Sequence, residues 1–335
     1  MNTEILPTHT PALFAAAVAR AAELLRAGEL VALPTETVYG LAANALNAKA
    51  VARIFEIKGR PTYNPIIVHV ASGEMARDCV ADWPKLAEKF SRAFWPGPLT
   101  LVLPRAEKIP DAVTAGGATV GVRWPSHPFM PAVIRACGFP LAAPSANLSN
   151  QISPTTAEHV RRQLTGKIPL IVDGGPSQVG IESTVLDLTV SPPRVLRPGM
   201  IHAESLAAVA GGLQDPLAPI SGQKLKSPGL LTKHYSPKAK LVLWRWRDAA
   251  DLRAQLAAAK FQMTAGWVIA HTQIPAGLAG ARVSVIPHEA KAFARGLYAE
   301  LYRCDAAGAQ WIVVEAPPER PEWAGIADRL RRAAA

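Results

Sequence analysis

Residues 58–70 read KGRPTYNPIIVHV and connect a helical pattern to a strand pattern. The helical periodicity of residues 49–57 ends at Gly59 and Pro61, because glycine commonly closes a helix and proline cannot continue one. Residues 65–70 (PIIVHV) are almost all apolar, which is typical of a strand buried on both faces. A helix followed directly by a buried strand predicts an α/β fold.

The same alternation extends in both directions along the first 211 residues. It predicts helices at residues 10–28, 86–94, 128–137 and 156–164, and strands at residues 30–33, 99–103, 119–124, 170–172, 183–188 and 194–196. Some of these strands follow one another without a helix between them, which favours antiparallel neighbours. We therefore predict a mixed sheet with helices for residues 1–211.

Residues 212–239 interrupt this pattern. They contain four prolines and four lysines and show no sustained periodicity, which is typical of a linker. A second α/β pattern occupies residues 240–335, with strands expected at 241–244, 267–270, 283–286 and 311–314 and helices at 249–259, 289–304 and 326–332. The sequence thus predicts two α/β domains, the second one smaller, joined by a linker.

The composition excludes several classes of protein. Of the 335 residues, 49% are hydrophobic and 19% are charged, which is the opposite of the balance in a disordered chain. No apolar run is long enough for a transmembrane helix. The three cysteines, Cys79, Cys137 and Cys304, form no C-x-x-C pair, so neither a disulfide framework nor a zinc site is expected. Scattered cysteines fit a reducing compartment, and we predict a cytoplasmic protein.

The net charge of +10, from 36 basic and 26 acidic residues, is spread over the chain. This balance suits anionic ligands, either nucleotides or RNA, without choosing between them. Familiar nucleotide-binding motifs are missing: Gly166-Lys167 is followed by Ile168 where a phosphate-binding loop has serine or threonine, and no G-x-G-x-x-G follows a strand. A bound nucleotide would therefore be held by another arrangement.

Cations and small polar residues follow several of the expected elements. Lys58 and Arg60 stand two residues apart after a helix, where they can bind one phosphate together or simply be solvated cations at a helix end. Ser145 and Asn147 follow the apolar residues 141–143, where they can hold a ligand close to the backbone or form an ordinary turn. Each pattern alone leaves both interpretations open.

Three further features lie in or after strands. The segment PTETVYG (34–40) follows a strand and has either the character of a binding loop or that of a helix cap and turn. His69 lies in an apolar strand, where a histidine is more often a core residue than a ligand. Arg123 lies in another apolar strand and needs an anionic partner, unless it faces solvent.

Taken together and in this order, seven segments resemble those of the threonylcarbamoyl-AMP synthase family in its long, two-domain form. They are PTETVYGL (34–41), KGRPTYNPIIVHV (58–70), WPGPLTLVL (95–103), VGVRWPSHP (120–128), APSANLSNQISPT (143–155), GIESTVLDL (180–188) and VLRPG (195–199). KHYSP (233–237) and GIADRL (325–330) are similar to the linker and second domain of that form.

The resemblance implies a nucleotidyltransferase that forms threonylcarbamoyl-AMP and pyrophosphate from L-threonine, bicarbonate and ATP. The product would be used to form N6-threonylcarbamoyladenosine at position 37 of tRNA. The threonylcarbamoyl-AMP would be handed over to the complex that transfers the threonylcarbamoyl group. The resemblance also implies a twisted, open sheet in the first domain, a Rossmann-like second domain and Mg²⁺ bound with ATP. Direct tRNA binding, the oligomeric state and the metal ligands stay open.

The family's site residues carry over by motif position. The threonine-binding residues would be Thr37, His69, Arg123, Ala143 and Ser183. The ATP-binding residues would be Lys58, Arg60, Asn64, Thr119, Ser145, Asn147, Ser153, Arg197 and Tyr235. Guanidinium groups suit carboxylates and phosphates, and positioning with charge neutralisation would carry the reaction without a covalent nucleophile.

Two details extend this expectation. The linker, residues 212–239, is expected to close over the reactive mixed anhydride as a lid, with Tyr235 against the nucleotide. Asn150 stands where the family's S-A-N-x-S-G motif has glycine. Because asparagine tolerates the left-handed conformation better than other non-glycine residues, we expect the loop to keep its shape.

Two other classes of protein remain as alternatives. An RNA-binding module would need stacking aromatic residues on a basic stripe, whereas aromatic residues make up 6% of this chain and the charge is spread. A carbamoyl transferase like those of hydrogenase maturation would carry cysteine clusters and an acylphosphatase-like segment, which this sequence lacks.

Overall fold

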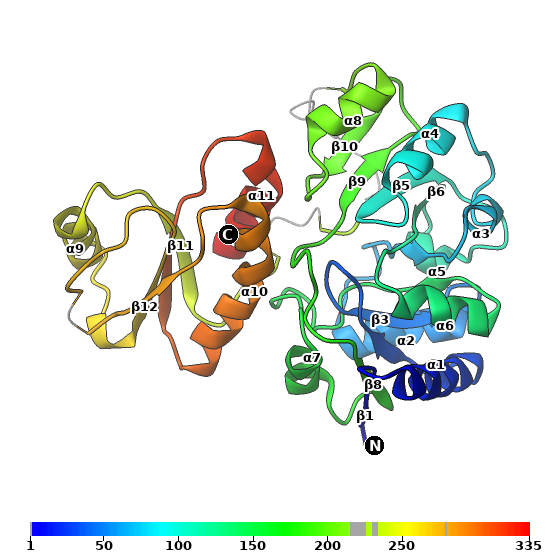
Figure 1. The fold of residues 1–335 in the computed structure, drawn as a ribbon, viewed down its shortest axis with the longest axis horizontal. Helices are drawn as coiled ribbons and strands as arrows, with labels where there is room; N and C mark the ends of the chain where they lie inside the picture. Colours follow the sequence, from blue (N-terminus) through cyan, green and yellow to red (C-terminus); the bar gives the residue numbers. More distant parts are fainter. Residues whose placement is uncertain (1, 215–225, 230–233, 279) are drawn as a thin grey trace. The chain divides into compact units, whose positions relative to one another are not determined.

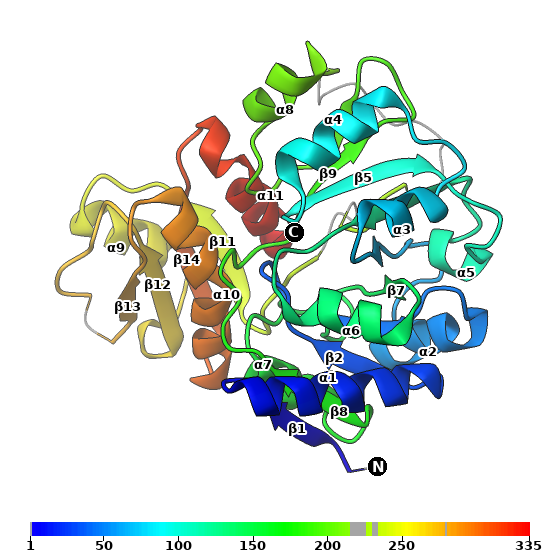
Figure 2. The same ribbon diagram turned by 45° about the vertical axis from the view of Figure 1, so that its right-hand side comes forward.

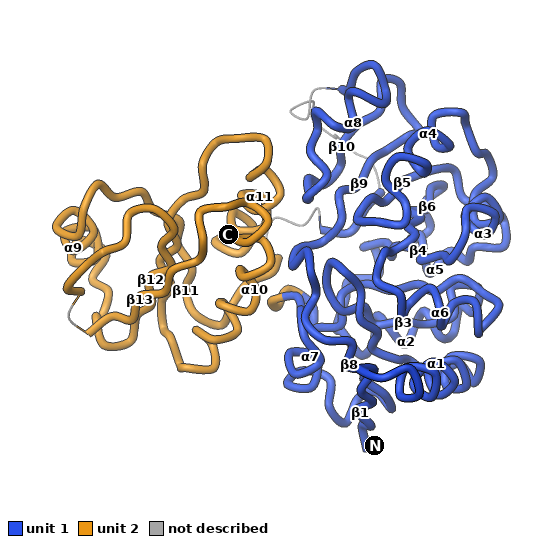
Figure 3. Tube along the Cα trace, in the orientation of Figure 1, with its two compact units in different colours: residues 1–149, 153–230 blue, residues 150–152, 231–335 orange. Residues whose placement is uncertain are grey.

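The computed structural model describes residues 2–214, 226–229, 234–278 and 280–335. The chain divides into two compact units, drawn in different colours in Figure 3. Unit 1 comprises residues 1–149 and 153–230, and unit 2 comprises residues 150–152 and 231–335. Of the predicted linker, residues 215–225 and 230–233 lie outside the described residues. No helix among the described residues is long and apolar enough to cross a membrane.

Unit 1 is built on a ten-stranded mixed sheet (Figure 1). Its strands are β1 (Glu4–Pro7), β2 (Val31–Leu33), β3 (Gly40–Asn44), β4 (Val68–His69), β5 (Leu99–Pro104), β6 (Thr119–Arg123), β7 (Leu141–Ala142), β8 (Leu170–Asp173), β9 (Thr184–Asp187) and β10 (Arg194–Arg197). They lie in the order β1-β8-β2-β3-β7-β4-β6-β5-β9-β10. Parallel pairs such as β4 with β6 occur beside antiparallel pairs such as β5 with β6, as predicted for a mixed sheet.

Helices pack on the sheet because its strands are apolar on both faces. The helices are α1 (Pro11–Arg26), α2 (Ala48–Lys58), α3 (Gly73–Asp78), α4 (Lys85–Phe94), α5 (Asp111–Thr114), α6 (Phe129–Cys137), α7 (Ala157–Leu164) and α8 (Ala203–Ala210). Val31 and Leu33 belong to the core cluster with α1 and α6, which lie side by side in Figures 1 and 2. Ala32, between them, belongs to the cluster with α2, α4 and α7.

Unit 2 is a smaller α/β unit with a four-stranded parallel sheet of order β11-β14-β12-β13. Its elements are β11 (Lys240–Trp244), α9 (Ala249–Ala258), β12 (Gly266–Ala270), β13 (Arg282–Val285), α10 (Ala290–Ala306), β14 (Trp311–Glu315) and α11 (Ala324–Ala334). These are the seven elements expected from the sequence, with boundaries shifted by one or two residues. A parallel sheet that alternates with helices agrees with the predicted Rossmann-like unit.

Several elements of unit 1 differ from the sequence-based expectation. The predicted strand at residues 65–70 is reduced to the two residues of β4, and the strands β1 and β3 and the helices α3, α5 and α8 were missed. The sequence of β3, GLAAN, has low β-propensity, and it forms a strand because β2 and β7 pair with it on either side. Tertiary pairing here overrides local preference.

Candidate functional site

The strand register places four of the predicted site residues, His69, Thr119, Arg123 and Arg197, on one face of the sheet in unit 1. His69 of β4 pairs with Arg123 of β6, and Val185 of β9 pairs with both Thr100 of β5 and Arg197 of β10. Paired residues point to the same face, and every second residue along a strand does so too. We call this surface of β4, β6, β5, β9 and β10 the site face.

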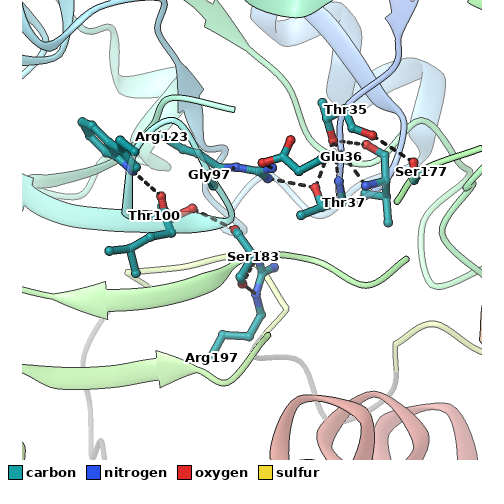
Figure 4. Close-up of polar contacts among 12 residues, drawn as sticks. Thr35, Glu36, Thr37, Gly97, Thr100, Arg123, Ser177, Ser183 and Arg197 are labelled. Carbon is teal, nitrogen blue, oxygen red and sulfur yellow. Dashed lines mark hydrogen bonds and ion pairs between the residues drawn. The ribbon is translucent and has the colours of Figure 1, made fainter. Parts of the chain in front are cut away.

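Arg123 is held by residues of the segment after β2. Its Nη2 lies 2.7 Å from Oε1 of Glu36, and both side chains are buried, at 4% and 7% exposure. Its Nη1 donates to Oγ1 of Thr37 at 2.9 Å, and its Nε donates to the carbonyl of Gly97 at 3.3 Å. Figure 4 shows Glu36 and Thr37 side by side in front of the guanidinium. The anionic partner that the buried Arg123 requires is therefore Glu36.

The ion pair sets the charge state of Glu36. Burial alone would raise the pKa of this carboxyl group, but the adjacent Arg123 and a backbone hydrogen bond from Ser126 keep the pKa below its usual value. Hydrogen bonds to Thr37 and Gly97 use two of the five guanidinium N–H groups, and Nη2 forms an ion pair with Glu36 without hydrogen-bond geometry, so each Nη atom retains an N–H for a further acceptor. Arg123 is thus oriented and still able to bind a carboxylate.

His69 is a neutral group on the site face. Burial, and then the charge of Arg123, lower the pKa of His69 to about 3. Its Nδ1 atom is buried and has no hydrogen-bond partner. An unpartnered imidazole nitrogen beside Arg123 suits a substrate group that can share a hydrogen bond.

A second polar group on the site face joins Thr100, Ser183 and Arg197. The hydroxyl groups of Thr100 and Ser183 lie 2.8 Å apart, and Nη2 of Arg197 donates to Oγ of Ser183 at 3.1 Å (Figure 4). Arg197 also donates to the carbonyl of Ser183 through Nε and Nη2. Two residues predicted for different substrates, Ser183 and Arg197, are therefore in direct contact.

Lys58 is buried and binds the loop after β7 through hydrogen bonds from its ammonium group, an arrangement we call the Lys58 clamp. Its Nζ donates to the carbonyl oxygens of Ser145 at 2.6 Å and Asn147 at 2.5 Å, and to Oδ1 of Asn147 at 3.3 Å. These three acceptors match the three N–H groups of an ammonium. Burial, and then the nearby Arg60, lower the pKa of Lys58 well below its usual value. The interpretation of Lys58 as a solvated cation at a helix end is therefore wrong, and its contact with ATP stays a prediction.

Arg60 and Asn64 are buried in the turn that follows α2. Arg60 donates from Nε to the carbonyl of Asn64 at 3.0 Å and from Nη2 to that of Pro65 at 2.7 Å. The side-chain amide of Asn64 is 1% exposed, and neither its nitrogen nor its oxygen has a partner. A buried amide without partners costs free energy unless a ligand completes its hydrogen bonds.

The remaining predicted residues of unit 1 are also buried or line the site face. Oγ of Ser153 donates to Oε1 of Glu182 at 2.5 Å. The backbone nitrogen of Ala143 donates to the carbonyl of Ile67, beside β4. Thr119 lines a narrow slot on the site face.

Part of the predicted linker lies on this face as well. Nζ of Lys226 is 3.0 Å from Oδ2 of Asp187 at the end of β9, and it also contacts Oγ1 of Thr189. The carbonyl of Pro228 accepts a hydrogen bond from Arg197 at 3.2 Å. The described residues 226–228 thus touch one of the predicted ATP-binding residues.

The predicted ATP-binding residue Tyr235 belongs to unit 2. Its ring is 1% exposed, stacks on Tyr298 with centroids 6.1 Å apart, and lies under the guanidinium of Arg329. Asn150 also belongs to unit 2 and adopts a left-handed φ of 65°, as expected from its place in the motif. The predicted contact of Tyr235 with the nucleotide stays a prediction.

Sequence reasoning missed three residues that support the site. They are Glu36, the partner of Arg123; Glu182, the acceptor for Ser153; and Thr100, the partner of Ser183. The signal for the two acids was their position inside the motifs PTETVYGL and GIESTVLDL. Thr100 lies inside the segment WPGPLTLVL in the same way, but its position in an apolar strand gave no sign of its partner.

A sheet face with an oriented guanidinium, a neutral histidine and several buried hydroxyl groups is typical of an α/β enzyme that binds small molecules. A family model described as "Telomere recombination" matches residues 23–199, and one described as "Threonylcarbamoyl-AMP synthase, C-terminal domain" matches residues 201–335. The chain belongs to the threonylcarbamoyl-AMP synthase family of nucleotidyltransferases. The resemblance and the fold class predicted from the sequence are confirmed.

Similar proteins cover almost the whole chain. A threonylcarbamoyl-AMP synthase of Pyrococcus abyssi is 41% identical over 318 residues, covering 93% of this chain and 92% of its own. A threonylcarbamoyl-AMP synthase of Bacillus subtilis is 41% identical over 343 residues, which cover 99% of this chain and 95% of its own. The crystal structure of P. abyssi Sua5 complexed with L-threonine superposes with a TM-score of 0.90 at 37% identity, covering 100% of this chain and 98% of its own.

Proposed function

We propose that this chain forms threonylcarbamoyl-AMP and pyrophosphate from L-threonine, bicarbonate and ATP. The observation that carries this proposal is the match, at 41% identity and over nearly the full length, to threonylcarbamoyl-AMP synthases of two distant organisms. A relative of the same architecture has been solved with L-threonine, which supports threonine as the amino-acid substrate.

The threonine carboxylate would bind Arg123. Glu36 and Thr37 orient the guanidinium and leave N–H groups on both Nη atoms for a bidentate contact. The unpartnered Nδ1 of His69 would take a hydrogen bond from the substrate amine, because this imidazole stays neutral at physiological pH. Ser183 is the buried hydroxyl available to the threonine side chain, and Ala143 directly follows β7, which pairs with the strand of His69.

ATP would lie along the remaining part of the site. Arg60 and Arg197, both buried, would bind its phosphates together with the buried hydroxyl of Ser153. The clamp by Lys58 gives the Ser145–Asn147 loop a fixed shape, so that its backbone and side chains can approach the phosphates. Thr119 and Asn64 would contact the nucleoside.

The reaction balances without a covalent enzyme intermediate. The threonine amine attacks bicarbonate, or the CO2 derived from it, to give a carbamate, with water released in the bicarbonate route. A carbamate oxygen then attacks the α-phosphorus of ATP, and pyrophosphate leaves. The chain's own contribution is to orient the reactants and to neutralise their charge.

Mg²⁺ would accompany ATP and neutralise its phosphates. Among the described residues no group of three or more His, Cys, Asp or Glu side chains is arranged to hold a metal ion. Glu36 faces Arg123 and Glu182 accepts from Ser153, so phosphate oxygens and water would supply most of the ligands.

Further steps belong to the same proposal. The product is a reactive mixed anhydride, and residues 212–239 would close over it as a lid, supported by residues 226–228 on the site face. The threonylcarbamoyl group would pass to the complex that modifies adenosine 37 of tRNA, in the cytoplasm.

Pyrophosphate release by the full chain tests the proposal. We expect release that needs ATP, bicarbonate and L-threonine together, with weak release for L-serine and none for L-valine. Serine lacks only the methyl group of threonine, whose burial contributes about 1 kcal/mol of binding free energy. Valine lacks the hydroxyl group, so the protein groups that bind this hydroxyl would be left without a hydrogen-bond partner. Equal release with valine and threonine would refute the assignment.

A further inference from the structure

Two buried hydroxyl groups on the site face share one hydrogen bond. Oγ1 of Thr100 on β5 lies 2.8 Å from Oγ of Ser183, which directly precedes β9. Thr100 is fully buried, and Ser183 is 1% exposed. Figure 4 shows this contact, with Arg197 against Ser183 on the other side. Because both hydroxyl groups are shielded from water, each of their hydrogens requires an acceptor from the protein or from a ligand.

The surroundings of Thr100 decide the direction of the shared hydrogen bond. Among the described residues, Ser183 is the hydrogen-bond partner of the Thr100 hydroxyl. If Ser183 donated to Thr100, the hydrogen of Thr100 would be buried without an acceptor, which is unfavourable. Thr100 is therefore the donor, and Oγ of Ser183 is the acceptor.

This direction leaves Ser183 able only to donate. A hydroxyl oxygen has two lone pairs. One of them accepts from Thr100, and the other accepts from Nη2 of Arg197 at 3.1 Å. Arginine has donors only, so the second bond runs from Arg197 to Ser183. The O–H of Ser183 is left for a ligand, and that ligand must offer an acceptor.

Strand pairing holds the Thr100 side chain in place. The pairing of Leu101 with Val122 puts Thr100 opposite Arg123 on the site face. A Cβ atom at Gly121 would lie 3.1 Å from the methyl carbon of Thr100, so this methyl group packs over the backbone of β6. A β-branched side chain is stiff at χ1, and the packed methyl group therefore also fixes the direction of the hydroxyl.

We propose that Thr100 is a positioning residue that selects a β-hydroxy amino acid through Ser183. This inference rests on the proposed function, in which the carboxylate of threonine binds Arg123, opposite Thr100. The O–H of Ser183 requires an acceptor, and the side-chain oxygen of threonine supplies it. An amino acid with an aliphatic side chain leaves this O–H buried without an acceptor and is rejected for that reason.

The test compares the full chain with its variants Thr100→Val and Thr100→Ser. Valine keeps the shape of threonine and removes the hydroxyl, whereas serine keeps the hydroxyl and removes the methyl group. The two variants thus separate hydrogen bonding from packing. Dissociation constants for L-threonine, for L-2-aminobutyrate (threonine without its hydroxyl) and for ATP are measured by titration calorimetry, with competition for the weaker amino acid. If Thr100→Val does not fold, Thr100→Ala replaces it.

For Thr100→Val we expect threonine affinity to fall about fivefold, the loss of one net hydrogen bond, and 2-aminobutyrate affinity to stay within about twofold. Thr100→Ser should keep the ratio of the two affinities within about twofold of the wild type, although its unfolding temperature falls because packing is lost. ATP affinity should stay within about twofold in both variants, since Arg197 keeps its contacts with the carbonyl of Ser183. In a Ser183→Ala background, Thr100→Val should not change the ratio further, because Thr100 acts through Ser183.

Equal losses for threonine and 2-aminobutyrate in Thr100→Val would overturn the inference, and so would an unchanged ratio of their affinities. The same change of ratio in Thr100→Ser, or an effect of Thr100→Val that persists in the Ser183→Ala background, would also overturn it. A wild-type chain that binds both amino acids equally well would do so too. If the wild type bound neither threonine nor ATP and released no pyrophosphate, the proposed function itself would fail, and the two failures are thereby distinguished.

Discussion

Glu36→Gln is expected to destabilise the ligand-free protein and to make it more dependent on threonine. Among the described ion pairs, Glu36 is the acidic residue that pairs with Arg123, at 2.7 Å, and the substitution removes its charge. The side chains of Glu36 and Arg123 are both buried. Loss of one partner of a buried pair typically costs about 3–5 kcal/mol. Glutamine keeps an oxygen acceptor, so we expect a value near 3 kcal/mol. For a unit of this size the unfolding temperature would fall by about 6–12 °C.

Threonine should reverse much of this loss. In the proposed site its carboxylate supplies the negative charge that the variant lacks, so the variant binds threonine more tightly than the wild type. Ligand at a hundred times its dissociation constant stabilises a protein by about 2.7 kcal/mol. The gap between variant and wild type in unfolding temperature should therefore narrow at saturating threonine.

The assay is thermal unfolding with and without L-threonine, with Glu158→Gln as the matched control. Glu158 pairs with Arg161 and Arg162 on the surface, and its side chain is 44% exposed. Exposed pairs contribute little, so this control should change the unfolding temperature by about 2 °C or less. The reasoning is refuted if ligand-free Glu36→Gln unfolds at the same temperature as the wild type. It is also refuted if threonine raises the unfolding temperatures of both proteins equally.

Three further predictions concern other groups of the site and its flanking loop. Lys58→Met should lower both the unfolding temperature and pyrophosphate release, because three acceptors at Ser145 and Asn147 lose their donor; a stable but inactive variant would assign Lys58 to ATP alone. His69 has a folded pKa of about 3 against 6.5 when unfolded, so its neutral form stabilises the fold fully above pH 6.5 and this stability is lost as the pH falls toward 3. Urea unfolding at pH 6.5 and 5 should show about 2 kcal/mol more loss for the wild type than for His69→Gln, and equal losses would contradict the shift. Asn150→Gly should raise stability by about 0.5–1 kcal/mol without loss of activity, since the φ of 65° costs glycine nothing.

The local patterns of the sequence determined most of the elements of unit 1 and all seven of the strands and α-helices described in unit 2. The apolar runs at residues 99–103 and 119–124 became β5 and β6, and Gly59 adopts the left-handed conformation that closes α2. These features depend on neighbouring residues along the chain, on side-chain periodicity and on backbone conformation, so they can be predicted without the fold. The order of the motifs likewise indicated the family, and the comparisons confirmed it.

The partners of the buried polar groups were decided by the tertiary structure alone. The sequence showed that Arg123 needed an anion, but only the strand register brings Glu36 and Thr37 to it from a distant segment. The sequence presented Lys58 as a phosphate ligand or a solvated cation, whereas the fold buries it as a clamp on a loop that follows β7. Hydrogen bonds and ion pairs of this kind form between segments that meet only when the sheet is assembled. Their geometry is set by strand pairing and burial, on which local periodicity carries no information.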